Sequence, residues 1–178
     1  MQTDVITGAF GYSGAAIARE LRAAGHQVRT LTGHPRGGPG AGDIDTRPLD
    51  FSDPEALVKD LAGAHTLYCT YWVRFPHGTA TRESAVVNSK LLFDAAARAG
   101  VARIVYVSIL HADSDSPYPY FSGKGEVERH LAASAPGSPK SSGRVSIPAA
   151  SAPLPGCPVS VRTWRPAARS SRAMAAPE

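Results

Sequence analysis

The sequence is poor in cysteine and contains no long hydrophobic run. Its two cysteines, Cys69 and Cys157, lie far apart and form no C-x-x-C pair, so neither a disulfide framework nor a zinc or other metal site is predicted. No apolar stretch approaches the roughly 20 residues that cross a bilayer, and Met1 leads almost directly into a predicted strand. We therefore expect a cytoplasmic protein without a membrane partner.

An excess of positive charge is also missing from most of the chain. The formal net charge is +4, yet residues 1–134 contain 13 Lys and Arg against 14 Asp and Glu, whereas residues 135–178 contain six against one. A basic face on the folded domain is therefore not predicted, and we do not expect nucleic acid as a partner.

The chain does contain a glycine-rich turn between a predicted strand and a predicted helix. Residues 4–6 indicate a short buried strand, and the apolar residues within 15–24 recur at helical spacing up to Gly25. The turn between them reads T-G-x-x-G-x-x-G over residues 7–14. Because of this context, it predicts a dinucleotide site rather than a chance group of glycines.

Each glycine of the turn has a separate predicted role. Gly8 permits the tight turn, Gly11 lets the backbone approach a pyrophosphate, and Gly14 lets the helix pack closely against the strand. Unpaired N–H groups at the start of the helix would face the phosphates.

The rest of the first 134 residues alternates between strand-like and helix-like segments. The predicted strands are 27–32, 44–49, 64–70 and 102–108, and the predicted helices are 53–61, 81–99 and 121–133. This alternation predicts an α/β fold, in which helices cover both faces of a doubly wound parallel sheet and the ligand binds at the carboxyl ends of the strands.

A Y-x-x-x-K motif follows the last of these strands. Tyr120 and Lys124 are four residues apart at a predicted helix start, so they share one face of the helix. An ammonium beside a phenol favours the phenolate, which would let Tyr120 donate or accept the proton that accompanies hydride transfer. Ser108, at the end of the strand, is placed to hold a substrate carbonyl.

These segments resemble the atypical and extended branches of the short-chain dehydrogenase/reductase superfamily. The resemblance runs from Asp4 to about Leu131 and includes the turn at 7–14, Pro48-Leu49-Asp50, Val107-Ser108 and the motif at 119–128. The chain is similar to the NmrA-like, complex I accessory-subunit-like and NAD-dependent epimerase/dehydratase-like groups. The resemblance implies a Rossmann fold, a nicotinamide cofactor and a small-molecule substrate, but it implies nothing about oligomeric state.

The resemblance also implies roles for single residues. Asp50 would accept a hydrogen bond from the adenine amino group, or would be only a turn or cap residue. Asn88 matches an Asn on the long helix of these enzymes, or is an exposed polar residue. The predicted catalytic residues are Ser108, Tyr120 and Lys124. The predicted cofactor-binding residues are Thr7, Gly8, Phe10, Gly11, Tyr12, Gly14, Arg36, Asp50 and Lys124.

The choice between NAD and NADP depends on the end of the second predicted strand. NAD-selective relatives have an acidic residue there, whereas this chain has Gly33-His34-Pro35-Arg36. With no carboxylate to repel a 2′-phosphate, and with Arg36 and Arg29 available to pair with it, NADP is slightly favoured.

Two features leave the function open. This branch of the superfamily contains reductases and also members that only bind the cofactor, so an oxidoreductase, a non-catalytic sensor or assembly module, and an inactive fragment are all compatible with the motifs. The aromatic run at 69–75 replaces small residues of many relatives, and it either walls off an apolar substrate or packs beneath a loop.

The composition changes at Ala135, after the predicted Rossmann domain of residues 1–134. Residues 135–178 contain eight Pro, eight Ser and nine Ala, and they show no sustained period, so we expect a disordered basic tail. Relatives have a sixth strand here that ends in Arg-Pro, followed by a substrate lobe. The sheet is therefore predicted to be incomplete at its C-terminal end.

Two explanations account for the missing strand. Residues 158–162 are a displaced sixth strand before Arg165-Pro166, or the reading frame has changed near Gly137. The frame change is favoured, because reading the codons for residues 137–144 one nucleotide later restores an apolar run.

Overall fold

The computed structural model describes residues 2–33, 44–134 and 159–164. The elements of this part of the chain are β1 (Thr3–Thr7), α1 (Tyr12–Ala23), β2 (Gln27–Thr32), β3 (Asp45–Pro48), α2 (Pro54–Leu61), β4 (Thr66–Cys69), α3 (Arg82–Arg98), β5 (Arg103–Ile109), α4 (Pro119–Ala133) and β6 (Val159–Trp164).

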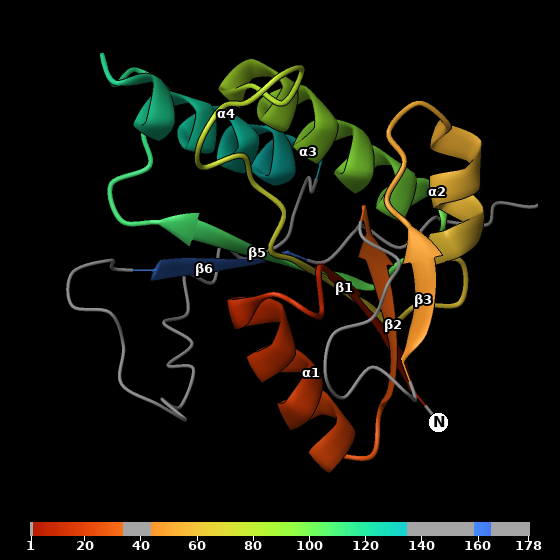
Figure 1. The fold of residues 1–178 in the computed structure, drawn as a ribbon. Coiled ribbons are helices and arrows are strands. Elements are labelled where there is room, and N and C mark those ends of the chain that lie inside the picture. The colour runs from red at the N-terminus through yellow and green to blue at the C-terminus, as the bar shows by residue number, and fades with distance from the viewer. Residues whose placement is uncertain (1, 34–43, 135–158, 165–178) are drawn as a thin grey trace, which may run out of the picture.

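The strands form one sheet in the order β3-β2-β1-β4-β5-β6. The first five strands are parallel, which confirms the predicted α/β fold of the Rossmann type. Helix α1 lies on one face of the sheet, and α2, α3 and α4 lie on the other (Figure 1). Since the chain leaves β1 toward β2 but reaches β4 on the opposite side, a ligand crevice is expected at the carboxyl ends of β1 and β4.

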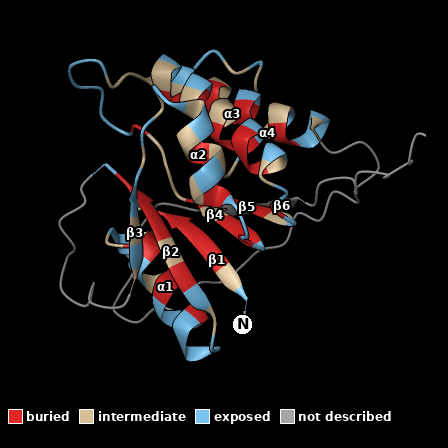
Figure 2. Cartoon of the chain, turned by 90° about the vertical axis from the view of Figure 1, so that its right-hand side faces the viewer, coloured by how far each residue is buried: buried red, intermediate tan, exposed pale blue. Residues whose placement is uncertain are grey.

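The core has two unequal parts, one on each face of the sheet. The larger part lies under α2, α3 and α4, where Phe93 packs edge-on against Tyr106 with 5.5 Å between ring centroids. The smaller part lies under α1 and contains Ile6, Ala18 and Leu21. Figure 2 shows that β1 and β4, in the middle of the sheet, are buried along most of their length.

Local sequence signals explain most helix boundaries. The Asp53 carboxylate caps α2 by accepting a hydrogen bond from the N–H of Ala56, and Pro54 occupies the first turn. Thr81 and Ser84 form a capping box at the start of α3. Helix α4 begins at Pro119, two residues before the predicted start, because a proline ring suits the first turn of a helix.

Strand β6 corrects the prediction for the C-terminal segment. Val159–Trp164 forms a strand rather than disordered chain, and it runs antiparallel to β5, with Trp164 opposite Ile104 and Val159 opposite Ile109. Strand β6 therefore covers the edge of β5. This pairing agrees with the displaced-strand alternative for these six residues, and the frame change stays a prediction. Residues 135–158 and 165–178 lie outside the described residues.

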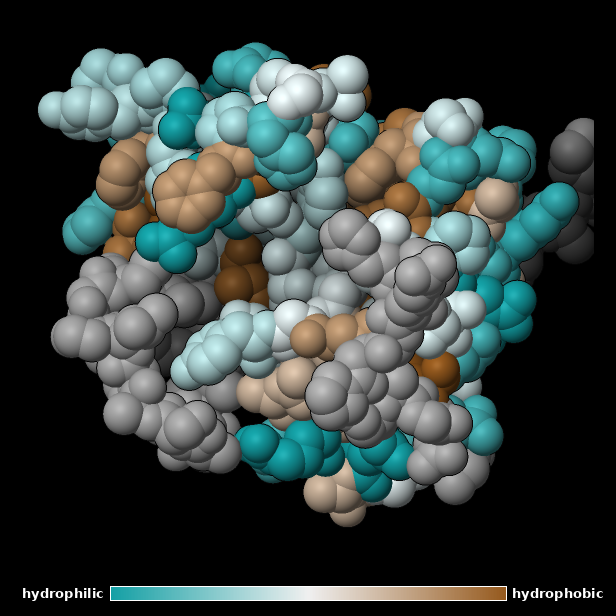
Figure 3. All heavy atoms as spheres, viewed as in Figure 1, coloured by the Kyte–Doolittle hydropathy of each residue, from teal (hydrophilic) through white to brown (hydrophobic). Residues whose placement is uncertain are grey.

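In the view of Figure 3 hydrophilic side chains cover most of the helical layer, and apolar residues appear in small separate areas. None of the helices described here is long and apolar enough to span a membrane.

Candidate cofactor and active site

The glycine turn connects β1 to α1 and is fixed by backbone hydrogen bonds. The N–H of Gly8 donates to the carbonyl of Leu31 at 2.8 Å, and the N–H of Ala9 donates to Thr30 Oγ1 at 3.0 Å, so β2 holds the start of the turn. The N–H of Gly11 donates back to the carbonyl of Gly8 at 2.9 Å. Gly8 has a φ of +68°, a left-handed conformation that favours glycine.

The other two glycines differ in what surrounds them. A Cβ atom on Gly14 would overlap the carbonyl oxygen of Gly8 and lie 2.8 Å from its carbonyl carbon, so the fold itself requires glycine there. A Cβ on Gly11 would have only the Gly8 oxygen within 4 Å, at 3.4 Å, and the backbone is extended (φ −84°, ψ 170°). The described residues therefore leave room in front of Gly11 for the close approach of a pyrophosphate.

The start of α1 is suited to an anion. No side chain caps this helix, and its first turn contains no acidic residue, whereas Asp53 caps α2 and Thr81 caps α3. Backbone N–H groups at an uncapped N-terminus, together with the helix dipole, favour a phosphate. The residues that are present therefore fit the pyrophosphate of a dinucleotide.

The remaining predicted residues of the turn are placed unequally. Thr7 is 1% exposed, and its Oγ1 accepts hydrogen bonds from the N–H groups of Thr70 at 2.8 Å and Tyr71 at 3.0 Å. Thr7 therefore joins the carboxyl ends of β1 and β4 beneath the turn. Phe10 is half-buried and Tyr12 is 80% exposed, so both side chains lie at the surface of the turn.

Asp50, Arg29 and Arg36 concern the adenosine end of a cofactor. The exposed Asp50 carboxylate accepts hydrogen bonds from the backbone N–H and the hydroxyl of Ser52, which lower its pKa. Asp50 therefore shapes this turn, and its contact with adenine stays a prediction. The Arg29 guanidinium binds the Asp45 carboxylate at 2.8 Å and the Asp60 carbonyl at 2.7 Å. The expectation that Arg29 is available for a 2′-phosphate is therefore wrong. Arg36 lies outside the described residues.

The proposed catalytic side chains lie at the carboxyl end of β5. Ser108 is 3% exposed, and its hydroxyl has no hydrogen-bond partner among the described residues. Lys124, on α4, is also 3% exposed, and its Nζ donates to the carbonyl of Val107 at 3.0 Å. The lysine head group therefore lies beside the peptide that joins Val107 to Ser108.

Two aromatic rings surround the Lys124 ammonium. Its Nζ lies 4.2 Å from the centre of the Trp72 ring and 4.5 Å from that of Tyr106. Burial lowers the pKa of Lys124 to about 8, although the Cys69 and Glu128 side chains act in the opposite direction. The group is therefore still largely charged near neutral pH.

Tyr120 contacts the same tryptophan. Its ring packs edge-on against Trp72, with 6.1 Å between the centroids, and against Phe121 at 6.0 Å. Trp72 therefore connects Tyr120 with Lys124. From the sequence, Trp72 was noted only as part of the aromatic run at 69–75, and Tyr106 was not identified. Tyr106 could have been found by strand periodicity, because it lies two residues before Ser108 on the same face of β5.

The aromatic residues in the run at 69–75 differ in their exposure to solvent. Tyr71 packs on Phe51 with 4.9 Å between centroids, and its hydroxyl accepts a hydrogen bond from Asn88 at 3.1 Å. Asn88 is thus held by a side chain of the loop after β4. Phe75 is 74% exposed. Packing therefore explains Tyr71 and Trp72, whereas Phe75 remains open to solvent.

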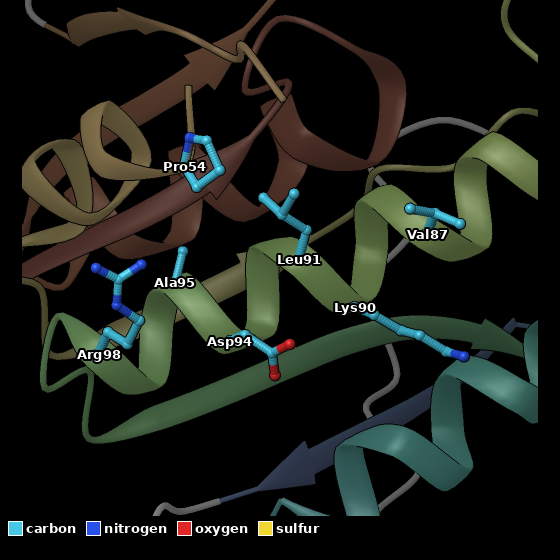
Figure 4. Close-up of a pocket in the computed structure, with 7 residues that line it drawn as sticks. All are labelled: Pro54, Val87, Lys90, Leu91, Asp94, Ala95 and Arg98. Carbon is cyan, nitrogen blue, oxygen red and sulfur yellow. The ribbon is translucent and has the colours of Figure 1, made fainter. Parts of the chain in front are cut away.

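A shallow groove of about 340 Å³ lies elsewhere, on the outer side of α3. Figure 4 shows that its walls come from α3 and from Pro54 at the start of α2. None of the predicted site residues lines this groove, so it is separate from the glycine turn. Among the residues that the structure describes, no three His, Cys, Asp or Glu side chains are grouped to hold a metal ion.

Comparison with known proteins agrees with this geometry. A family model described as NAD(P)H-binding matches residues 8–136. No curated protein matches the chain.

Solved structures resemble the chain at low identity. A UDP-N-acetylglucosamine 4-epimerase from Bacillus cereus is 20% identical, with a TM-score of 0.57 over 72% of this chain and 47% of that protein. A triphenylmethane reductase from Citrobacter sp. is 24% identical, with a TM-score of 0.60 over 74% and 45%. MoeE5 in complex with UDP-glucose and NAD is 25% identical, with a TM-score of 0.60 over 76% and 50%. The chain thus spans about half the length of these proteins.

Proposed function

This chain belongs to the family of NAD(P)H-binding domains, and we propose that it is an NAD(P)-dependent oxidoreductase of the short-chain type that acts on a carbonyl or hydroxyl group of a small molecule. One observation carries the proposal. Tyr120 and Lys124 both contact Trp72, and the Lys124 ammonium donates to the Val107 carbonyl next to Ser108, at the carboxyl end of β5.

The turn would hold the pyrophosphate of the cofactor. Gly11 leaves room for its approach, and the N–H groups at the start of α1 would donate hydrogen bonds to its oxygens. When bound, the nicotinamide supplies or accepts a hydride.

The protein's own side chains would then manage the proton and the substrate oxygen. The Ser108 hydroxyl, which has no partner in the described part of the chain, would donate a hydrogen bond to that oxygen. The Tyr120 phenol would give its proton to the same oxygen in reduction and take it back in oxidation. The positive charge of Lys124 would favour the phenolate and so bring the pKa of Tyr120 closer to neutral.

Substrate and cofactor preference are finer proposals. MoeE5 binds UDP-glucose beside NAD, so nucleotide sugars belong in a substrate panel with simple aldehydes, ketones and quinones. Strand β2 ends at Thr32 and is followed by Gly33, which leaves no carboxylate to repel a 2′-phosphate. We therefore expect a small preference for NADP over NAD, which comparison of the two dissociation constants would test.

The decisive variant for the enzyme is Tyr120→Phe. Because phenylalanine keeps the ring that packs on Trp72 and Phe121, the fold and NADPH affinity should not change. Turnover on the panel should fall by roughly 10²- to 10⁴-fold, the usual contribution of a general acid. If the wild type turns over no substrate while both proteins bind NADPH equally, the enzyme is excluded.

That result would favour a cofactor-binding sensor or assembly module. A specific observation supports this alternative, because the Lys124 ammonium is buried and already donates to the Val107 carbonyl. Redox-dependent binding of a partner would then be expected, measured with NADP⁺ and NADPH in parallel.

A further inference from the structure

Trp72 contacts one face of α4 at three positions. The Tyr120 ring meets the indole edge-on, a Cβ atom on Gly123 would lie 3.4 Å from Trp72 Cη2, and Lys124 Nζ lies over the indole face. These residues are at i, i+3 and i+4, so they form a single strip along the helix. A Cβ on Gly123 would lie closer to Val86 Cγ2, at 3.1 Å, than to the indole, so the helix backbone packs between these two side chains.

Ring packing alone fixes the indole. Trp72 Nε1 is buried and has no hydrogen-bond partner among the described residues. A tryptophan normally finds a partner for this group when buried, so its position here follows from the contacts of its rings.

The rings of Trp72 and Tyr106 both face the charged end of Lys124. The Lys124 ammonium donates a hydrogen bond to the Val107 carbonyl. The titratable side chains that influence it are Cys69 from β4 and Glu128 from α4, and Tyr106 faces it from β5. Burial raises the pKa of Cys69 to about 11, so the thiol carries no charge near pH 8. The faces of Trp72 and Tyr106, together with the Glu128 carboxylate, therefore attract the ammonium.

We propose that Trp72 is a positioning residue, whose indole holds the Lys124 ammonium and the Tyr120 ring in one fixed arrangement beside Ser108. This inference rests on the proposed function for its catalytic consequence. The contact by which Trp72 positions the Lys124 ammonium can be tested without any measurement of turnover.

Titration of Lys124 tests the hold directly. The protein is labelled with ¹³C at lysine Cε, and the Lys124 signal is assigned by its loss in Lys124→Met. In Trp72→Leu an apolar wall remains but the aromatic face is gone, so the charged form loses its attraction. The midpoint should fall from about 8 by roughly half a unit to one unit. Trp72→Phe, which keeps a ring, should shift it by less than half as much.

Phe51→Leu is the matched control. It removes another half-buried ring, one that packs on Tyr71, and should leave the Lys124 midpoint unchanged. An unchanged or raised midpoint in Trp72→Leu would overturn the proposal, as would an equal shift in Phe51→Leu.

Kinetics test the consequence for the proposed reaction. In Trp72→Leu kcat should fall by ten- to hundredfold with KM within twofold, because misplacement of a catalytic group by about 1 Å has effects of this size. Trp72→Phe should restore most of kcat. A kcat unchanged in Trp72→Leu would refute the positioning role. Absence of turnover in the wild type would instead refute the proposed function, and the titration would still decide whether Trp72 holds Lys124.

Discussion

Gly11 and Gly14 lie three residues apart in the same turn, yet a side chain at each should have opposite effects. A Cβ on Gly14 would overlap the backbone of Gly8, whereas a Cβ on Gly11 would make only an ordinary contact with the Gly8 carbonyl oxygen at 3.4 Å. Gly14→Ala should therefore destabilise the fold, and Gly11→Val should remove dinucleotide binding from a protein that stays folded.

The magnitudes follow from these contacts. Overpacking at Gly14 is expected to lower the free energy of unfolding by about 1–3 kcal/mol, which lowers Tm by roughly 3–10 °C at this chain length. Gly11 is the N-cap of α1 in an extended conformation, so Gly11→Val should lower the free energy of unfolding by at most about 1 kcal/mol. If valine prevents two backbone N–H groups from reaching the pyrophosphate, about 3–6 kcal/mol of binding is lost, which exceeds a hundredfold in Kd.

Thermal melts followed by circular dichroism and fluorescence titration with NADPH separate the two effects. Ala15→Val is the control for Gly11→Val, since it adds the same side chain at an exposed position in the first turns of α1. It should leave NADPH affinity within about twofold of the wild type. If Gly11→Val binds NADPH as the wild type does, the dinucleotide does not bind at this turn, and the assignment of Gly11 is wrong.

Two further predictions concern pH and the sheet edge. Between pH 8 and 10.5 unfolded Lys124 stays protonated while the folded residue releases its proton, so its contribution to stability rises with pH. In denaturant melts, the free energy of unfolding of the wild type minus that of Lys124→Met should rise by about 3 kcal/mol over this window. A difference that does not change with pH would contradict the lowered pKa of the buried ammonium. A chain ending at Ser134 lacks β6 and exposes β5, so Tm should fall by roughly 5 °C or more, whereas an equal Tm would mean that β6 adds no stability.

Local patterns in the sequence predicted the elements whose ends are marked by local chemistry. Residues 27–32 were predicted to their exact bounds, because a run rich in β-branched residues ends at Gly33. Strand β6 was the weaker prediction. Its six residues lie within a segment whose average composition favours disorder, and it is defined by pairing with β5 rather than by its own pattern.

The site divides in the same way. The glycine turn could be predicted from the sequence, because the roles of Gly8 and Gly14 depend on backbone geometry within a few residues. The environment of Lys124 could not, because Trp72 lies 52 positions earlier in the chain. The use of Arg29 was misjudged for the same reason, since its partner Asp45 belongs to the neighbouring strand.

The proposed cofactor site and the proposed catalytic site depend on different parts of the fold. The pyrophosphate site consists of backbone groups that β1, β2 and α1 hold in place, so it tolerates change in the helices on the far face of the sheet. The residues proposed for proton transfer include a buried cation, which lies under α4 against two rings from β5 and the loop after β4. Substitutions at Trp72 or Tyr106 can therefore alter catalysis while dinucleotide affinity is kept. A relative that keeps the turn but lacks these rings would be expected to bind NAD(P) without the lysine position described here.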